Sequence, residues 1–144
     1  MKNLSFALSL LFVITSFDSN AQRTTSRAAK GDTVWVIINH IKVDKKEQFE
    51  KFITETFWGA SNKLKGNDRT VFKQTRVLYP TKPEADGTLS YVFIMDPVVN
   101  GGDYDLRSLL GKIYGQQKAS EYENVFNETA ASEQTVYVDV QSEN

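Results

Sequence analysis

Two segments of the chain are apolar on both faces of the strand that each would form. They are residues 34–41, VWVIINHI, and residues 89–96, LSYVFIMD, and both are rich in β-branched and aromatic side chains. Because successive side chains of a strand point to opposite faces, a strand that is apolar at both alternate sets of positions belongs in the interior of a covered sheet. We therefore expect these two segments to be the central strands.

Helical periodicity follows the first of these strands. Asp44 and Glu47 have the spacing of a capping box, and an apolar stripe that includes Phe49 and Phe52 recurs at helical intervals. The turn-forming residues 66–68, Gly-Asn-Asp, predict the end of this helix.

Two further strands are predicted. Residues 70–79 alternate less cleanly and should pair with residues 89–96 as an antiparallel hairpin, because prolines and a glycine lie between them. Residues 135–140, TVYVDV, alternate strictly and predict the last strand.

Two helical segments are expected between the third and fourth strands. Asp103 or Asp105 should cap the first of them, and Gly115 should bend or end it. Ser120 and Glu123 have the spacing of a second capping box and predict the start of the other segment.

The resulting order is strand, helix, strand, strand, helix pair, strand. This is the split βαβ order of a ferredoxin-like α+β sandwich, with a four-stranded antiparallel or mixed sheet whose first and third strands are adjacent in the middle. Right-handed crossovers place the helices on one face. The other face would expose more apolar surface than a monomer usually does, so we expect a homodimer packed sheet to sheet.

The chain resembles the dimeric α/β-barrel superfamily, which includes the antibiotic-biosynthesis-type monooxygenases. The resemblance lies in the βαββαβ order and in residues 39–52, NHIKVDKKEQFEKF, where a strand ends in a polar pair, a basic turn follows and an aromatic-striped helix begins. It covers residues 33–140. It implies a homodimer with a pocket between sheet and helices, which family members use for aromatic or polyketide ligands, for haem, or for no known ligand.

Asn39, His40 and Tyr91 are the candidate catalytic residues, since each is a polar group on a central, otherwise apolar strand. Asn39 and His40 are neighbours and must point to opposite faces. A hydrogen bond that fixes the strand end or the subunit interface is the structural alternative for His40. The resemblance implies that Asn39 binds substrate or an oxygen intermediate. His40 does not match the helix histidine of haem-degrading members, so haem degradation is not expected. A tyrosine or lysine stays open as a haem ligand, but no cofactor is expected.

Other polar or aromatic side chains on the predicted strands and helix are candidate ligand-binding residues. Gln74 and Arg76 would share a strand face, and the tryptophans could form the wall of an aromatic site, although aromatics at such spacings are commonly core residues. Arg76 could instead form an ion pair with Asp139. The candidates are Trp35, Trp58, Gln74, Arg76, Phe93 and Tyr137.

The first 21 residues, MKNLSFALSLLFVITSFDSNA, have the layout of a secretory signal peptide. Their apolar run is shorter than the roughly 20 residues that cross a bilayer as a helix, so cleavage after Ala21 is favoured over a membrane anchor. We expect an exported protein, periplasmic or secreted, with no stable membrane anchor after cleavage. Residues 22–32 are expected to be a flexible leader and residues 33–144 a single domain.

Composition narrows the chemistry further. The chain has no cysteine, which excludes a disulfide framework and a thiolate zinc site. A net charge of −1 with mixed signs argues against nucleic acid as a partner. Asp96, Asp103 and Asp105 could hold calcium through oxygen atoms, but helix capping explains them more simply, and no metal site is expected.

Two functions remain open at this point. The first is binding of a small aromatic or hydrophobic molecule with cofactor-independent, monooxygenase-like chemistry. The alternative is a non-catalytic exported domain for ligand binding or interaction.

Overall fold

The computed structural model describes residues 27–143. The predicted signal peptide, residues 1–21, lies outside these residues, as do the first residues of the predicted leader. Where the leader is described, the amide of Ala28 donates to Oδ1 of Asp96 at 2.8 Å, and Gly31 and Asp32 exchange backbone hydrogen bonds with Gln141.

The sheet has four strands, β1 (Thr33–Lys42), β2 (Thr75–Leu78), β3 (Thr88–Met95) and β4 (Thr135–Val140). Their order is β2-β3-β1-β4 and every neighbouring pair is antiparallel. The two segments that are apolar at both sets of positions are therefore the adjacent central strands, which confirms that prediction.

An interrupted helical stretch follows β1. It comprises a 3-10 turn η1 (Val43–Lys45), helix α1 (Lys46–Lys51), a π-helical turn η2 (Phe52–Phe57) and a second 3-10 turn η3 (Trp58–Lys63). The predicted capping box is wrong, because the chain already turns at Val43 and no side chain caps either η1 or α1.

Residues 66–74, largely predicted as strand, form helix α2 (Gly66–Gln74), and only the last part of the prediction is strand β2. The hydroxyl of Thr75 donates to the carbonyl of Val71 at 2.8 Å, a back-bond to the preceding turn that threonine can make. Phe72 packs on the rings of Phe57 and Trp58 at 4.5 and 5.2 Å. Tertiary packing thus overrides the strand propensity of this threonine-rich segment.

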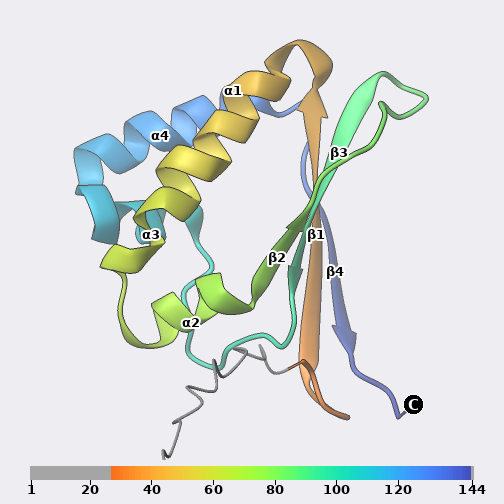
Figure 1. The fold of residues 1–144 in the computed structure, drawn as a ribbon, viewed down its shortest axis with the longest axis vertical. Coiled ribbons are helices and arrows are strands. Elements are labelled where there is room, and N and C mark those ends of the chain that lie inside the picture. The colour runs from red at the N-terminus through yellow and green to blue at the C-terminus, as the bar shows by residue number, and fades with distance from the viewer. Residues whose placement is uncertain (1–26, 144) are drawn as a thin grey trace, which may run out of the picture.

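Two more helices, α3 (Leu106–Tyr114) and α4 (Gln116–Thr129), precede β4. Asp105 caps α3 by accepting from the amide of Ser108 at 2.7 Å, and Gly115 separates the helices at a φ of 85°. The second capping box is wrong, because α4 begins at Gln116, four residues before the predicted start. The helices lie on one face of the sheet (Figure 1), which confirms the ferredoxin-like α+β fold.

Strand alternation divides the side chains cleanly between the two faces of the sheet. On β3, Leu89, Tyr91, Phe93 and Met95 are buried and pack with the helices, whereas the residues between them are only partly buried. The opposite side, here called the bare sheet face, has no helix on it (Figure 1). Its apolar side chains are Val34, Val36, Ile38, Leu78, Val92, Ile94 and Tyr137.

None of the helices in residues 27–143 combines the length and the apolar character that a membrane-spanning helix needs.

Candidate functional site

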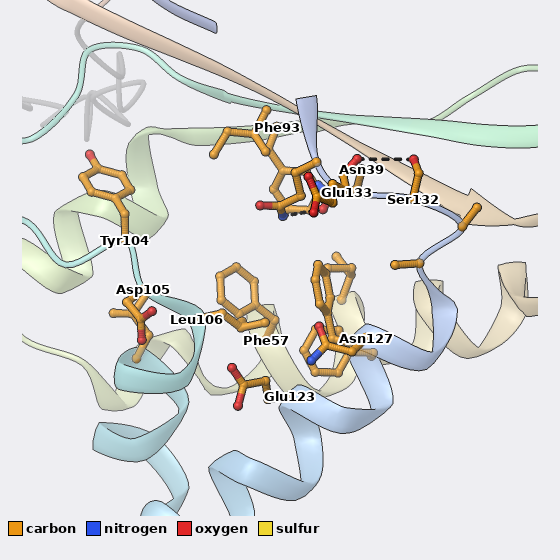
Figure 2. Close-up of a pocket in the computed structure, with 18 of the residues that line it drawn as sticks. Asn39, Phe57, Phe93, Tyr104, Asp105, Leu106, Glu123, Asn127, Ser132 and Glu133 are labelled. Atoms are coloured by element: carbon orange, nitrogen blue, oxygen red, sulfur yellow. Dashed lines mark hydrogen bonds between the residues drawn. The ribbon is translucent and has the colours of Figure 1, made fainter. Parts of the chain in front are cut away.

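A cavity of about 630 Å³ lies between the helix-facing side of β1 and β3 and the helices (Figure 2). Its floor is buried and apolar except for one amide, that of Asn39. The floor residues are Asn39, Phe52, Ile53, Phe93, Met95 and Leu109. Its rim is exposed and polar, and comprises Asp105, Asn127, Ser132, Glu133 and Gln134.

The π-helical turn η2 contributes part of the cavity wall. Phe52, Ile53 and Phe57 all belong to this turn and all line the cavity. A π-helical turn is wider than an α-helical one and is frequent at functional sites. Here it presents two phenylalanine rings to one space.

The amide of Asn39 is 4% exposed, and its Oδ1 accepts a hydrogen bond of 2.7 Å from Nε2 of Gln134. Within residues 27–143, Nδ2 of Asn39 makes no side-chain hydrogen bond, yet the residue lines the cavity. In the described residues the buried side-chain polar atom without a partner is Oε1 of Gln74, so Nδ2 of Asn39 is accessible from the cavity that the residue lines. The geometry therefore offers this N–H donor to whatever fills the cavity.

His40 lies on the other face of β1, as expected for the neighbour of Asn39. Its Nε2 is 3.1 Å from the hydroxyl oxygen of Thr135 on β4, and it pairs across the sheet with Ser90. His40 is not among the residues that line the cavity. This contact matches the structural alternative, a hydrogen bond on the side of the expected subunit interface.

Tyr91 pairs with Asn39 across β1 and β3 but points away from the cavity wall. Its hydroxyl donates to Oε1 of Glu50 at 2.7 Å, and its ring lies 4.6 Å from that of Phe49. Burial, and then the hydrogen bond and charge of Glu50, raise the pKa of Tyr91 well above the usual tyrosine value. The phenol is therefore held neutral, and it is not positioned to touch a molecule in the cavity.

Among the candidate ligand-binding residues, Phe93 lines the cavity. The two tryptophans do not line the cavity, but each packs on an aromatic residue that does. Trp35 packs on Tyr104 with ring centroids 5.0 Å apart, and Trp58 packs on Phe57 at 5.2 Å. They support two rings of the wall without forming the wall themselves.

The remaining candidates lie elsewhere. Gln74 is the last residue of helix α2, so the prediction that it shares a strand face with Arg76 is wrong. Its buried Oε1 has no hydrogen-bond partner in the described part of the chain. Arg76 contacts Asp96 at 3.0 Å, and not Asp139. Tyr137 is 51% exposed on the bare sheet face.

Most of the cavity was not predicted from the sequence. Phe52 and Ile53 have the helical spacing of core residues, and Asp105 and Glu123 have the spacing of helix caps, so neither signal indicates a cavity. The segment from Ala130 to Gln134 connects α4 to β4 and carries no motif, yet all of it lines the cavity.

The three aspartates considered for calcium are engaged with protein groups. Asp96 pairs with Arg76, Asp103 pairs with Lys112 at 2.8 Å, and Asp105 caps α3. Residues 27–143 contain no group of three or more His, Cys, Asp or Glu side chains that could hold a metal ion.

Comparison with solved structures finds three matching chains, including the following two. A solved structure from Caulobacter crescentus, provisionally described as an antibiotic biosynthesis monooxygenase, is 14% identical with a TM-score of 0.43, and the match covers 79% of this chain and 92% of that one. One from Nitrosomonas europaea with the same provisional description is 9% identical with a TM-score of 0.39, covering 78% and 92%. No protein-family model and no curated protein matches. We therefore infer the function from the chemistry of the cavity.

Proposed function

We propose that the cavity binds a small aromatic or hydrophobic molecule. The observation that carries this proposal is the buried apolar floor with a single amide donor, Asn39, in it. Ligand sites are commonly spaces of about 300–1,000 Å³ lined by apolar and aromatic side chains with a few polar groups that fix orientation. A volume of about 630 Å³ is within this range.

The aromatic side chains of the wall explain why a ring is the preferred occupant. Phe52, Phe57, Phe93 and Phe126 come from three different elements and line one space. Figure 2 labels Phe57 and Phe93 among them. Aromatic pairs prefer offset or edge-to-face contacts, and walls on several sides offer such contacts to a planar ligand. Asn39 then orients the ligand through a hydrogen bond to an acceptor atom of that ligand.

The test is binding of a panel of quinones, flavonoids and haem, measured as thermal shift and as loss of the compound. Leu106→Trp places a larger side chain in the cavity wall and should abolish the shift. Val43→Trp is the matched control, because Val43 is 47% exposed in η1 and does not line the cavity, so it should leave binding unchanged. If no compound binds to the unaltered protein, or if both variants bind equally well, the proposal is wrong.

A cofactor-independent oxygenase is a second candidate, and Asn39 is the observation that favours it. An electron-rich phenol can react with dioxygen directly when a site excludes water and orients the ring. Because His40 and Tyr91 lie outside the cavity wall, the polar group available for such orientation on the floor is Asn39. Oxygen uptake with a bound phenol would support this candidate, whereas binding without turnover would favour the non-catalytic alternative.

We further propose that the protein is an exported homodimer. The bare sheet face supports the dimer, because several apolar side chains of that face are only partly buried in the single chain. The N-terminal residues 1–21 support export. Mass spectrometry of the protein recovered from a periplasmic extract should give an N-terminus at Gln22, and an uncleaved N-terminus there would contradict the cleavage.

A further inference from the structure

We infer that the cavity selects ring-bearing molecules that carry a protonated amine and disfavours those that carry a carboxylate. This inference rests on the proposed ligand-binding function and adds the charge class of the ligand. The charge preference depends on how charged side chains are distributed around the cavity. Neither the fold nor the net charge of the chain determines that distribution.

Among residues 27–143, three carboxylates line the cavity, those of Asp105, Glu123 and Glu133, and no lysine, arginine or histidine does. They come from the residue before α3, from α4 and from the segment before β4. They therefore lie on different sides of the opening (Figure 2). A charged group on a ligand therefore passes between acidic side chains as it enters the cavity, whichever way the ring of the ligand is turned.

The acidic character of the rim is only partly compensated by neighbouring groups. Nη1 of Arg107 lies 3.5 Å from Glu123, but the Arg107 side chain is 54% exposed and is not part of the cavity wall. Asp105 accepts from the amide of Ser108 at 2.7 Å, which orients its carboxylate without adding a full positive charge. No ion pair to Glu133 is present in the described residues.

Asn39 gives an independent indication that a polar ligand occupies this space. It is 4% exposed, and its Nδ2 has no side-chain partner in residues 27–143, although its Oδ1 is held by Gln134. Because Nδ2 is accessible from the cavity, it can donate to an acceptor atom on a ligand. The floor thus recognises a ring with an acceptor atom, and the rim recognises a positive group that extends toward solvent.

Local charge and not whole-protein charge is responsible for this selectivity. The chain carries a net charge of only −1, so long-range repulsion of anions by the whole molecule is weak. Opposite charges within several ångströms attract and like charges repel, most strongly where solvent is partly excluded. Added salt screens this preference, since the screening length shortens as ionic strength rises.

The test uses three probes with one ring system: 2-naphthylmethylamine, 2-naphthalenemethanol and 2-naphthoic acid. In calorimetric titration of residues 22–144 at low salt, the affinity for the amine should exceed that for the alcohol, and the affinity for the alcohol should exceed that for the acid. We expect the amine to bind about tenfold more tightly than the acid, with a smaller ratio at high salt. Equal affinity of the amine and the acid would overturn the inference.

Two variants and a matched control assign the effect to the rim. Glu133→Gln and Glu123→Gln should each reduce the ratio of amine to acid affinity about threefold while leaving the alcohol unchanged. Glu121→Gln is the control, because Glu121 is an exposed residue of α4 that does not line the cavity. If all three variants change the ratio equally, the rim is not responsible and the inference is wrong.

The same titrations separate this inference from the proposed function. Binding of the alcohol with no preference between amine and acid would contradict only the charge selectivity. Failure of all three probes to bind would contradict both the charge selectivity and ligand binding by the cavity. Thermal unfolding of each variant, measured in parallel, shows that a loss of affinity does not come from a loss of structure.

Discussion

Asn39 on the central strand β1 and Gln134 immediately before β4 are 95 positions apart in the chain, and their side-chain amides are joined by a hydrogen bond of 2.7 Å. This bond ties the rim segment before β4 to the floor of the cavity. It also fixes the orientation of the Asn39 amide and leaves the Nδ2 group available to the cavity. Recognition of a ligand by Asn39 therefore depends on a residue that is itself exposed at the rim.

Replacement of Asn39 separates its role in binding from its role in stability. Asn39→Leu keeps the side-chain volume but removes the donor, so we expect a ring-bearing ligand with an acceptor atom to bind about fivefold to tenfold more weakly, about 1 kcal/mol. Gln134→Ala removes the partner but leaves the donor, and should have a smaller effect on affinity. Equal losses in the two variants, measured by titration, would show that Asn39 does not contact the ligand.

Tyr91 should contribute to stability through its bond to Glu50. Tyr91→Phe removes a buried hydroxyl that donates at 2.7 Å, and we expect it to lower the free energy of unfolding by about 1–2 kcal/mol. Tyr79→Phe, at a 45% exposed position whose ring packs on Tyr91 and away from the bare sheet face, should have no measurable effect. Urea unfolding of both variants at neutral pH tests this, and a neutral Tyr91→Phe would contradict it.

The raised pKa of Tyr91 also predicts an alkaline dependence of stability. Because the folded protein holds the phenol neutral above the ordinary value of 10.0, the unfolded chain loses this proton first as the pH rises. Stability from this residue is present below pH 10.0 and is lost progressively above it. Tyr91→Phe should flatten this alkaline decline relative to the unaltered protein, measured as the midpoint of urea unfolding against pH.

Lys112 joins helix α2 to the loop before α3 by contacting Asp68 at 2.7 Å and Asp103 at 2.8 Å. Burial of Asp103 opposes ionisation, but hydrogen bonds from Lys112 and Ser108 outweigh it, so the pKa of Asp103 lies below the ordinary value of 3.8. Its contribution to stability is therefore present above pH 3.8 and is lost as the pH falls through the lower folded-state value.

Lys112→Met should therefore destabilise the protein by about 1 kcal/mol at neutral pH, and by less in acid. The matched control is Lys51→Met, because Lys51 pairs with Glu55 at 4.0 Å where both side chains are largely exposed, and its loss should be close to zero. Equal effects of the two substitutions on the free energy of unfolding would contradict a special role for Lys112.

Gly102 is required by the close approach of the Val71 side chain on α2. A Cβ at this position would lie 2.5 Å from Cγ2 of Val71 on α2, so Gly102→Ala should destabilise the fold by about 1–3 kcal/mol through overpacking. Gly111→Ala is the control, since its Cβ would meet only the flexible end of Gln116 and alanine favours a helix interior. The Tm should fall for the first variant and stay or rise for the second.

The proposed dimer is tested by a charge on the bare sheet face. Val36→Lys places an ammonium group among apolar side chains of that face and should yield a monomer in sedimentation at micromolar protein concentration. Val138→Lys is the control, because Val138 lies on the edge strand and pairs with Trp35, whose side chain is on the helix-facing side. A protomer that is already monomeric without substitution would contradict the proposed dimer.

The order of the elements was predictable because it depends on patterns that neighbouring residues share. The two central strands are apolar at both sets of positions, and β4 alternates strictly, so each could be recognised by itself. Helix α2 could not, because residues such as Thr70 and Thr75 favour strands in isolation. Only their back-bonds to Gly66 and Val71, and the contact of Phe72 with Trp58, show why a helix forms there.

The cavity was less predictable than the fold. Asn39 was found because a polar residue on an otherwise apolar strand is conspicuous, and Phe93 because it lies on the other central strand. The rim residues Glu133 and Gln134 reach the cavity only through the turn after α4. No local pattern in the sequence predicts that this turn places Glu133 and Gln134 at the cavity.

Strand β1 separates the cavity from the bare sheet face, because its successive side chains point to opposite sides. Asn39 belongs to the cavity and His40, next in sequence, belongs to the opposite surface, where it meets Thr135. Half of the side chains of this strand are therefore out of reach of anything held inside, however reactive they are. A more elaborate site in this fold would have to recruit its additional groups from the helices and the rim, where side chains can change without disturbing the other side of the wall.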